Sequence, residues 1–265
     1  MIEVSKLFTL NDFSVNALII KWEILDTEES LEDYSYEVYK SIGVDNEKTL
    51  LTTVDGMQFE YHDEEAVINK RAVRYYYSVI PVNKTTGDKG KEINCVAMFD
   101  KRKDKYVNYI RYVNRKYLKV INNEPGYILV SRKFGQKCTV CWDDIRRQHK
   151  KSGCTHCYGT GYEGGYHTPY KIKFNYMNIP MMNSENVGVD TRTDNAGDVT
   201  IWTTSYPIIS VGDIFVTEEN LRYKVTNVQY TNKNNEFILR QILNLELLSP
   251  ADVVYKVAID KEGVL

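Results

Sequence analysis

Four cysteines in two closely spaced pairs constrain this chain more than any other feature of its sequence. They follow the pattern C-x2-C-x12-C-x2-C, as Cys138, Cys141, Cys154 and Cys157. Each C-x2-C pair forms a tight loop that points two sulfur atoms at one centre, and two such loops complete a tetrahedral site. The spacing therefore predicts one structural Zn²⁺ bound by all four cysteines. Four protein ligands leave no position for water or substrate, so such a site contributes folding free energy rather than catalysis.

Other uses of these cysteines are disulfide bonds, an iron–sulfur centre or redox chemistry. A reducing cytoplasm disfavours disulfides, and the common iron–sulfur centres use different cysteine spacings. A redox role needs only one pair, whereas two pairs in register favour one shared ion. His149, His156 and His167 are possible substitute ligands, although four cysteines already satisfy the metal. The basic residues near the loops, which would help to hold the thiolate charge, are Lys137, Arg146, Arg147, Lys150 and Lys151.

The net charge of −2 conceals segments of opposite sign. Residues 1–100 carry 10 Lys and Arg against 19 Asp and Glu, residues 101–152 carry 15 against 4, and residues 153–265 carry 9 against 13. A basic block between acidic ones favours docking to an acidic partner or to phosphate, and a solvated basic face is the simpler alternative. We expect no signal peptide and no membrane partner, because no apolar run approaches the roughly 20 residues that span a bilayer.

Residues 1–99 are predicted to form a β-sandwich. Short runs rich in aromatic and β-branched residues, such as "YSYEVYKS" (34–41) and "RYYYSVIPVNKTTG" (74–87), are separated by turn-forming residues. Within these runs apolar and polar residues alternate, as strands with one buried face require. The alternating positions expected to face the core are Tyr36, Val38, Tyr75, Tyr77 and Val79, with Lys40 next in the alternation after Val38.

The same region resembles a fibronectin type III domain over about residues 8–98. Trp22 lies where that family buries a tryptophan on its second strand, and Tyr75 is a candidate for its tyrosine corner. The resemblance implies that both are core residues, and that the domain binds or spaces other proteins. Cys95 lies on a strand pattern and is most simply a small buried hydrophobic residue.

Residues 100–126 are predicted to form a basic linker helix, because apolar residues recur there at intervals of three and four. The expected apolar side comprises Val107, Ile110, Val113, Tyr117 and Val120 or Ile121. The expected basic side comprises Arg111, Arg115, Lys116 and Lys119. Such a helix either packs on a neighbouring domain with its charges in solvent or docks between acidic surfaces, and the sequence does not choose between the two.

Residues 127–170 are predicted to form the four-cysteine zinc-binding module, a small zinc ribbon. Glycines after the fourth cysteine let the chain fold back closely over the metal loop. The full string, from "CTVCWDD" to "CTHCYGTGYEGGYHTPY", resembles a motif of structural proteins from the virions of tailed bacteriophages. Thr139 stands where that motif carries proline. The matching positions are Cys138, Cys141, Trp142, Asp143, Cys154, Cys157, Tyr158, Gly159, Thr160, Gly161, Tyr162, Gly164, Gly165 and Tyr166.

Residues 171–265 are predicted to form a small β-barrel. The segment "VGDIFV" followed by "RYKVTNVQ" resembles the barrel of phage head–tail joining proteins and tail adaptors. We expect a long polar loop at 183–198, a hairpin turn at Asn234-Asn235 and a closing strand in "LSPADVVYKVAI". Glu218 and Glu219 are expected to lie in a turn rather than to form a catalytic acid pair.

The sequence thus predicts a mainly β, multi-domain protein without catalytic activity, since it contains no P-loop, G-x-S-x-G or H-E-x-x-H motif. The resemblances imply a structural protein of a tailed-phage virion, in the neck or head-to-tail connector (collar), that is made in the host bacterial cytoplasm. The implied partners are further copies in a ring and other virion proteins (portal or adaptor, tail or collar), with DNA nearby. Alternatives are a tail or baseplate protein, a nucleic-acid-binding zinc ribbon, and a chaperone-like or redox protein.

Overall fold

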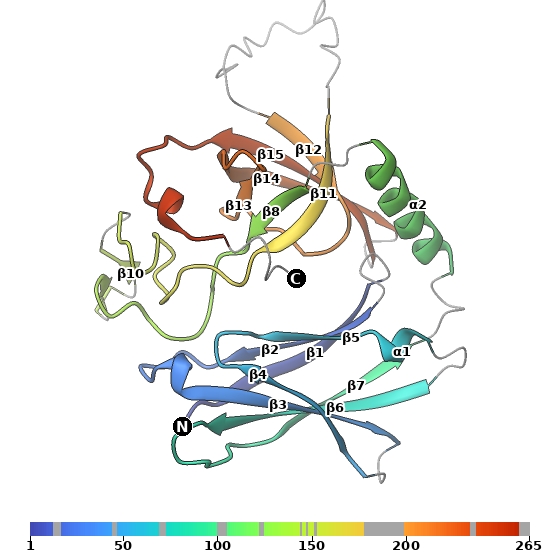
Figure 1. The fold of residues 1–265 in the computed structure, drawn as a ribbon, viewed down its shortest axis with the longest axis vertical. Helices are drawn as coiled ribbons and strands as arrows, with labels where there is room; N and C mark the ends of the chain where they lie inside the picture. The colour runs from blue at the N-terminus through green and yellow to red at the C-terminus, as the bar shows by residue number, and fades with distance from the viewer. Residues whose placement is uncertain are drawn as a thin grey trace, which may run out of the picture. The chain divides into compact units, whose positions relative to one another are not determined.

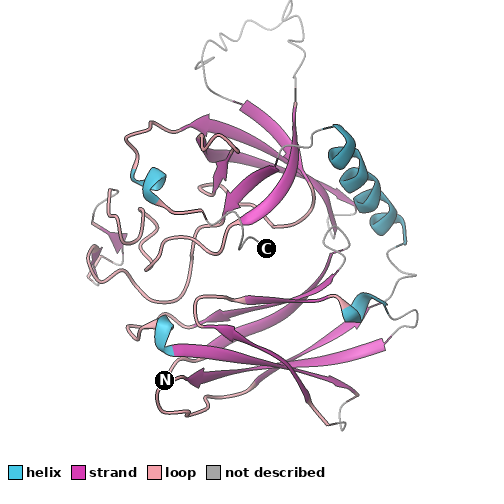
Figure 2. Ribbon diagram, viewed as in Figure 1, coloured by secondary structure: helices cyan, strands magenta, loops and turns pink. Residues whose placement is uncertain are grey.

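The computed structural model describes the chain except residues 13–16, 44–46, 69–72, 100–104, 122–124, 144, 147, 151–152, 178–198, 234–236 and 260–265. The described residues are mainly β, with two larger open sheets, a closed barrel and one long helix, which confirms the predicted fold class at this level (Figures 1 and 2). The chain divides into two compact units. We call Met1–Asn108 with Arg132–His167 the two-sheet unit, and Tyr109–Ser131 with Thr168–Leu265 the barrel unit.

In the two-sheet unit, seven strands form the two larger antiparallel sheets. The three-stranded sheet has the order β1-β2-β5 and the four-stranded sheet the order β4-β3-β6-β7. Two short helices, η1 (Leu31–Asp33) and α1 (Glu65–Ile68), connect strands. The strand bounds are β1 Val4–Asp12, β2 Ala17–Ile24, β3 Tyr34–Ile42, β4 Thr49–Asp55, β5 Glu60–Asp63, β6 Val73–Asn83 and β7 Ile93–Phe99.

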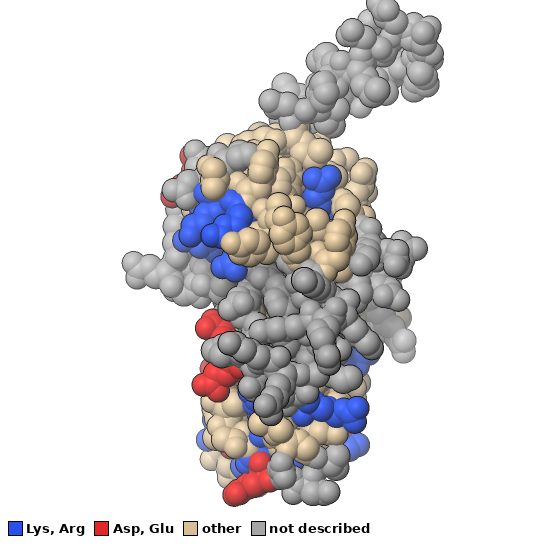
Figure 3. Space-filling model, turned by 90° about the vertical axis from the view of Figure 1, so that its right-hand side faces the viewer, with Lys and Arg blue, Asp and Glu red and all other residues tan. Residues whose placement is uncertain are grey.

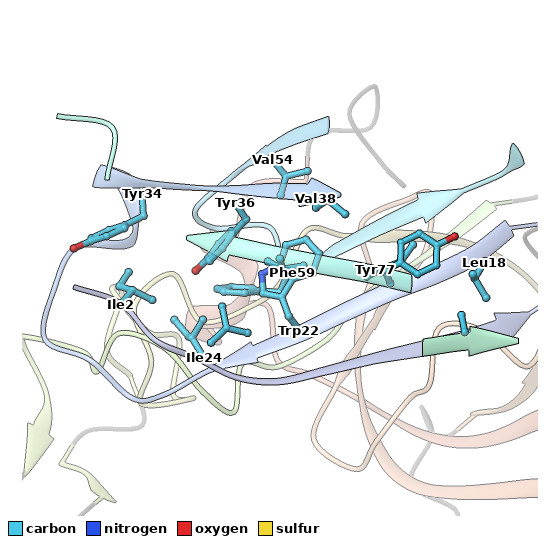
Figure 4. Packing of buried hydrophobic residues seen from close by; sticks show 14 of the residues in the cluster. Ile2, Leu18, Trp22, Ile24, Tyr34, Tyr36, Val38, Val54, Phe59 and Tyr77 are labelled. Atoms are coloured by element: carbon cyan, nitrogen blue, oxygen red, sulfur yellow. The ribbon is translucent and has the colours of Figure 1, made fainter. Parts of the chain in front are cut away.

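One hydrophobic core lies between these sheets. Trp22 of β2 packs on Tyr36 of β3 with ring centroids 5.4 Å apart, and Tyr36 packs on Phe59 (Figure 4). Trp22 and Tyr75 are each 1% exposed, so both are core residues as predicted. The predicted alternation is also confirmed. The inward positions Tyr36, Val38, Tyr75, Tyr77 and Val79 are all buried.

A buried polar cluster links the two sheets. Asp63 at the end of β5 accepts a hydrogen bond of 2.7 Å from the hydroxyl of Tyr77 on β6. The ammonium of Lys40 on β3 lies 2.6 Å from the same carboxylate. The amide of Ala66 also donates to Asp63, at 3.0 Å. Because an isolated buried carboxylate would be strongly destabilising, these partners together stabilise the cluster, which connects β5 with β3 and β6.

The barrel unit is a closed six-stranded barrel with the order β11-β12-β15-β14-β13-β8, all neighbours antiparallel. Its interior is filled by side chains, as is usual for small barrels. Phe174 and Phe215 meet edge to face at 4.8 Å, and a β-carbon on Gly126 would lie 2.4 Å from the Phe215 ring. The strand bounds are β8 Pro125–Leu129, β11 Tyr170–Tyr176, β12 Val199–Thr203, β13 Ile214–Val216, β14 Arg222–Lys233 and β15 Phe237–Leu247.

The barrel closes differently from the prediction. Residues Tyr127–Leu129, expected in the zinc module, belong to β8, which pairs with both β11 and β13. The tail forms a short 3-10 helix, η2 (Val253–Lys256), instead of a closing strand. Its carbonyls at Val254 and Val257 accept hydrogen bonds from the buried guanidinium of Arg222, so they are satisfied without strand pairing. The expected loop at 183–198 and turn at Asn234-Asn235 lie outside the described residues.

The long helix, α2 (Lys105–Ile121), forms where predicted but presents a different side to the protein. Val107, Arg111 and Leu118 are buried, whereas Val113 is 40% and Val120 83% exposed. The expected apolar side is therefore partly exposed, and one residue of the expected basic side is buried.

Polar contacts with the barrel explain this orientation of α2. The guanidinium of Arg111 donates to the carbonyl of Ile238 at 3.0 Å, and the side-chain amide of Asn114 donates to the carbonyl of Leu239 at 3.1 Å. These carbonyls belong to β15, and side-chain donors satisfy their hydrogen-bonding capacity. A pattern of apolar residues cannot reveal such partners.

Candidate metal centre

The four predicted cysteines meet in one buried cluster within Arg132–His167, which we call the knuckle segment. Each cysteine is at most 6% exposed, and their sulfur atoms all lie within 4.8 Å of one another. The Sγ atoms of Cys138 and Cys154 are 3.9 Å apart and those of Cys141 and Cys157 are 3.2 Å apart, so the thiols are free and not joined as disulfides. Four sulfurs around a tetrahedral ion with metal–sulfur bonds of about 2.3 Å would be roughly 3.8 Å apart. The cluster could hold a metal ion.

Backbone hydrogen bonds shape the two loops that carry the cysteines. The carbonyl of Cys138 accepts from the amide of Trp142 at 3.1 Å, and the carbonyl of Cys154 accepts from the amide of Tyr158 at 2.8 Å. In both loops, the carbonyl of the first cysteine accepts from the backbone amide four residues later, so the two loops have the same geometry. A small hairpin of β9 (Trp142–Asp143) and β10 (Gln148–His149) leaves the first loop.

The electrostatics of the cluster favour a bound cation. Burial raises the pKa of the Cys138 and Cys141 thiols, and at Cys141 hydrogen bonding with neighbouring thiols raises it further. Burial also opposes ionisation of Cys154, but hydrogen bonds from the amides of Cys157 and His156 outweigh it and lower the pKa to about 7. Several buried thiolates so close together would repel one another, so a positive ion is needed before all four can ionise.

Glycines close the chain over the second loop, as predicted. Gly161 has φ of 85°, which favours glycine, and its carbonyl accepts the amide of Cys138 at 3.0 Å. At Gly165 a β-carbon would lie 2.7 Å from the carbonyl oxygen of Cys157. Any larger residue there would displace the backbone of a ligand loop.

Lys137, directly before the first cysteine, is held from several sides. Its ammonium lies 4.1 Å from the ring centroids of both Trp142 and Tyr162. It also donates to the hydroxyl of Tyr162 at 2.8 Å and lies 2.7 Å from the carboxylate of Asp26, just beyond β2. Cation–π contacts and an ion pair thus fix the entry to the first loop against the two-sheet unit.

A second group of contacts fastens the knuckle segment to the core of the same unit. Phe134 packs edge to face on Phe59 with ring centroids 5.0 Å apart. The buried guanidinium of Arg132 donates to the carbonyl of Tyr166 at 2.9 Å and reaches Met57. The knuckle segment therefore packs as part of the two-sheet unit and shares its core.

Of the three candidate histidines, His156 and His167 do not belong to the cysteine cluster. The ring of His156 is about half exposed and lies 3.5 Å from Glu163. His167 packs against Phe59 and Phe134, where burial, with the nearby positive charges of Arg132 and Lys21, lowers its pKa to about 3. His149 takes part in β10. Among the described residues, the group that could hold a metal ion contains cysteines alone.

The predicted basic residues have varied surroundings. Lys137 is held as described above. Arg146 and Lys150 are exposed, and Lys150 lies 3.9 Å from Asp143. Arg147 and Lys151 lie outside the described residues.

Sequence reasoning missed Arg132 and Phe134, and it saw Lys137 only as a nearby charge. Their partners are Met57, Phe59 and Asp26, more than seventy residues earlier in the chain. The available signal was a basic and aromatic run, "SRKFGQKC", directly before the first cysteine.

Glu218 and Glu219 lie in the turn between β13 and β14, as expected. No described helix combines the length and the apolar character that a membrane span requires. Comparison of the sequence with family models and with curated proteins found no match.

Proposed function

We propose that the cysteine cluster binds one Zn²⁺ and that this ion has a structural role. The observation that supports it most is the burial of all four sulfur atoms in one group, with ligands from two loops of the same geometry. Thiolate ligands suit zinc, and four of them fill its coordination shell. The bound ion would supply the positive charge that the buried thiolates need, and it would not activate water.

The site would stabilise the two-sheet unit. The described residues of the knuckle segment form two short strands, β9 and β10, and these are too small to bury a core alone. The ion and the contacts of Arg132, Phe134 and Lys137 would together keep the segment folded. This arrangement favours a scaffold over an enzyme.

We further propose a non-enzymatic structural protein of a tailed-phage virion, in the neck or head-to-tail connector, that assembles as a ring. Support comes from the resemblance of the cysteine motif to virion proteins. Support also comes from the buried Trp22 on the second strand, as in fibronectin type III domains, and from a closed barrel with packed aromatic rings inside. A tail or baseplate position is the nearest alternative, because it uses the same kinds of contact.

Metal analysis of the purified chain tests the zinc site. We expect about one zinc per chain, lost in Cys154→Ser and retained in Cys95→Ser. Cys95 is a matched control because it is a partly buried thiol outside the cluster. Substitution by Co²⁺ should give the absorption of a tetrahedral thiolate site. Retention of the full metal content by a folded Cys154→Ser variant would disprove the ligand assignment. Detection of iron with acid-labile sulfide would show that the site holds an iron–sulfur cluster and not zinc.

Sedimentation of the pure chain and cryo-electron microscopy of intact particles test the assembly. We expect closed rings at high concentration and density for the chain in the neck. A chain that stays monomeric and is absent from particles would refute the virion proposal without affecting the zinc site.

A further inference from the structure

The outward side of α2 combines exposed aromatic rings with positive charge. Tyr109 is 63% and Tyr112 54% exposed, although tyrosine usually buries most of its ring. Arg115, Lys116 and Lys119 are exposed on the same helix. We call these five residues the α2 face. Tyr109 and Lys116 lie opposite the buried side that carries Arg111 and Leu118, and Arg115 lies at the border of that side, one turn from Arg111.

The charge of the α2 face is not balanced locally. The sequence of α2 contains five Lys and Arg and no Asp or Glu. Among the described residues, no carboxylate forms an ion pair with Arg115, Lys116 or Lys119. Figure 3, which faces this side of the molecule, shows Lys and Arg side chains in several separate groups, one of them in the upper part of the picture. Positive charge without a local counter-charge favours an anionic partner.

Four of the five side chains of the α2 face line one hollow. Tyr112, Arg115, Lys116 and Lys119 line a depression of about 230 Å³. The ammonium of Lys116 lies 5.5 Å from the centroid of the Tyr112 ring. Positive groups and an aromatic ring thus face the same space, within about two turns of one helix.

We propose that the α2 face binds single-stranded nucleic acid without sequence preference. Arg and Lys would neutralise backbone phosphates, and the tyrosine rings would stack on exposed bases, the combination used by proteins that bind single strands. An acidic protein is the weaker fit, because lysine is depleted from the centres of protein interfaces and two lysines lie at the centre of this face. A duplex would leave the rings without bases to stack on. The inference does not depend on the proposed zinc site or virion role.

Fluorescence anisotropy with the full-length chain tests this proposal. The probes are a labelled mixed-sequence single strand, the matching duplex, and heparin as a competitor that carries charge but no bases. One variant is Lys116→Glu with Lys119→Glu. Its matched control is Lys171→Glu with Lys224→Glu, which changes the charge equally at exposed positions of β11 and β14. A second variant is Tyr109→Ala with Tyr112→Ala.

We expect the single strand to bind more tightly than the duplex. The charge reversal on α2 should weaken binding about tenfold or more at low salt, and reduce the slope of log affinity against log salt by about 1 to 1.5. The tyrosine variant should weaken binding about fivefold or more without changing that slope. The control should bind nearly as well as the wild type.

Several outcomes would overturn the proposal. They are no binding of the single strand, equal binding of duplex and single strand, and equal loss of binding in the control. Binding that survives both α2 variants would assign the site to other basic residues. Binding of an acidic peptide but not of nucleic acid, with the peptide binding lost in the charge-reversal variant, would show that the ligand is an acidic protein. All substituted side chains are exposed, and circular dichroism checks that each variant is folded.

Discussion

The two units integrate segments from distant parts of the sequence by different means. The knuckle segment joins the two-sheet unit through side-chain contacts of Arg132, Phe134 and Lys137 and through one short backbone bridge, in which Thr27 donates to the carbonyl of Gly135 and accepts from the amide of Lys137. In the barrel unit, β8 joins through backbone hydrogen bonds along both of its edges. A backbone ladder depends little on side-chain identity, whereas side-chain contacts and metal ligands depend on single residues. The two-sheet unit should therefore be the more sensitive to point changes at its junction.

Removal of the metal should give the largest difference between the units. A strong chelator should strip the proposed ion, and structural zinc contributes on the order of 10 kcal/mol to folding in small domains. Hydrogen exchange, followed by mass spectrometry, should show lost protection at residues 138–162 and unchanged protection in β14 and β15. Re-addition of Zn²⁺ should restore it. Equal loss of protection in both units would contradict the distinction.

Truncation of a side chain in the barrel core should destabilise the barrel unit and leave the two-sheet unit unchanged. Phe215 is 1% exposed and packs on Phe174, so Phe215→Ala should lower the free energy of unfolding of the barrel by about 3–5 kcal/mol. The metal content should not change. Leu221→Ala is the matched control, because Leu221 is 43% exposed and should cost less than about 1 kcal/mol. Loss of the metal from Phe215→Ala would show that the units are coupled.

Arg132→Ala should weaken the attachment of the knuckle segment by a smaller amount. The change leaves the carbonyl of Tyr166 without its guanidinium donor and opens a gap at Met57, at a cost of about 2–3 kcal/mol. Denaturant unfolding, followed by tryptophan fluorescence, measures it. Its exposed neighbour offers a control, since Lys133→Ala should change stability by less than about 0.5 kcal/mol. Similar values for the two variants would rule out the buried contact as the cause.

The smallest effect should be a pH dependence caused by His167. Its pKa is lowered to about 3 in the folded chain, so between the unfolded value near 6.5 and pH 3 the unfolded state binds the extra proton. Stability from this group is complete above pH 6.5 and is lost as the pH falls. His167→Phe should therefore lose less stability than the wild type between pH 7 and pH 5, by about 1–2 kcal/mol. The stability of His156→Gln, a change at an exposed ring, should depend on pH as the wild type does. If both variants show the same pH dependence, His167 is not its cause.

Local patterns predicted much of this molecule. Alternation placed Tyr36, Tyr75 and Tyr77 in the core, and the cysteine spacing predicted which four thiols gather. The alternation predicts structure from residues that are close together in the sequence. The cysteine spacing predicts structure because each C-x2-C pair forms a known loop geometry. The presence of a helix within residues 100–126 and the presence of a barrel were likewise predicted from local patterns, although α2 is shorter than predicted, Lys105–Ile121.

Features that depend on distant partners were not predicted. The orientation of α2 depends on β15 carbonyls, which attract Arg111 and Asn114. The tail is a 3-10 helix because Arg222 satisfies its carbonyls. Polar side chains that hydrogen-bond to backbone groups of distant segments produce no periodic pattern in the sequence. Their effects on α2 and on the tail can therefore be identified only from the three-dimensional structure.

The strands β8 and β11 are direct neighbours in the barrel, with Ile128 paired to Tyr170, yet the whole knuckle segment separates them in the sequence. The knuckle segment is thus a long insertion between two strands that pair with each other. Joining its two ends carries an entropic cost that grows with the length of free chain between them. An ion that ties Cys138 to Cys157 would shorten that free length before the strands meet, so loading the metal early would speed closure of a barrel that contains none of the ligands.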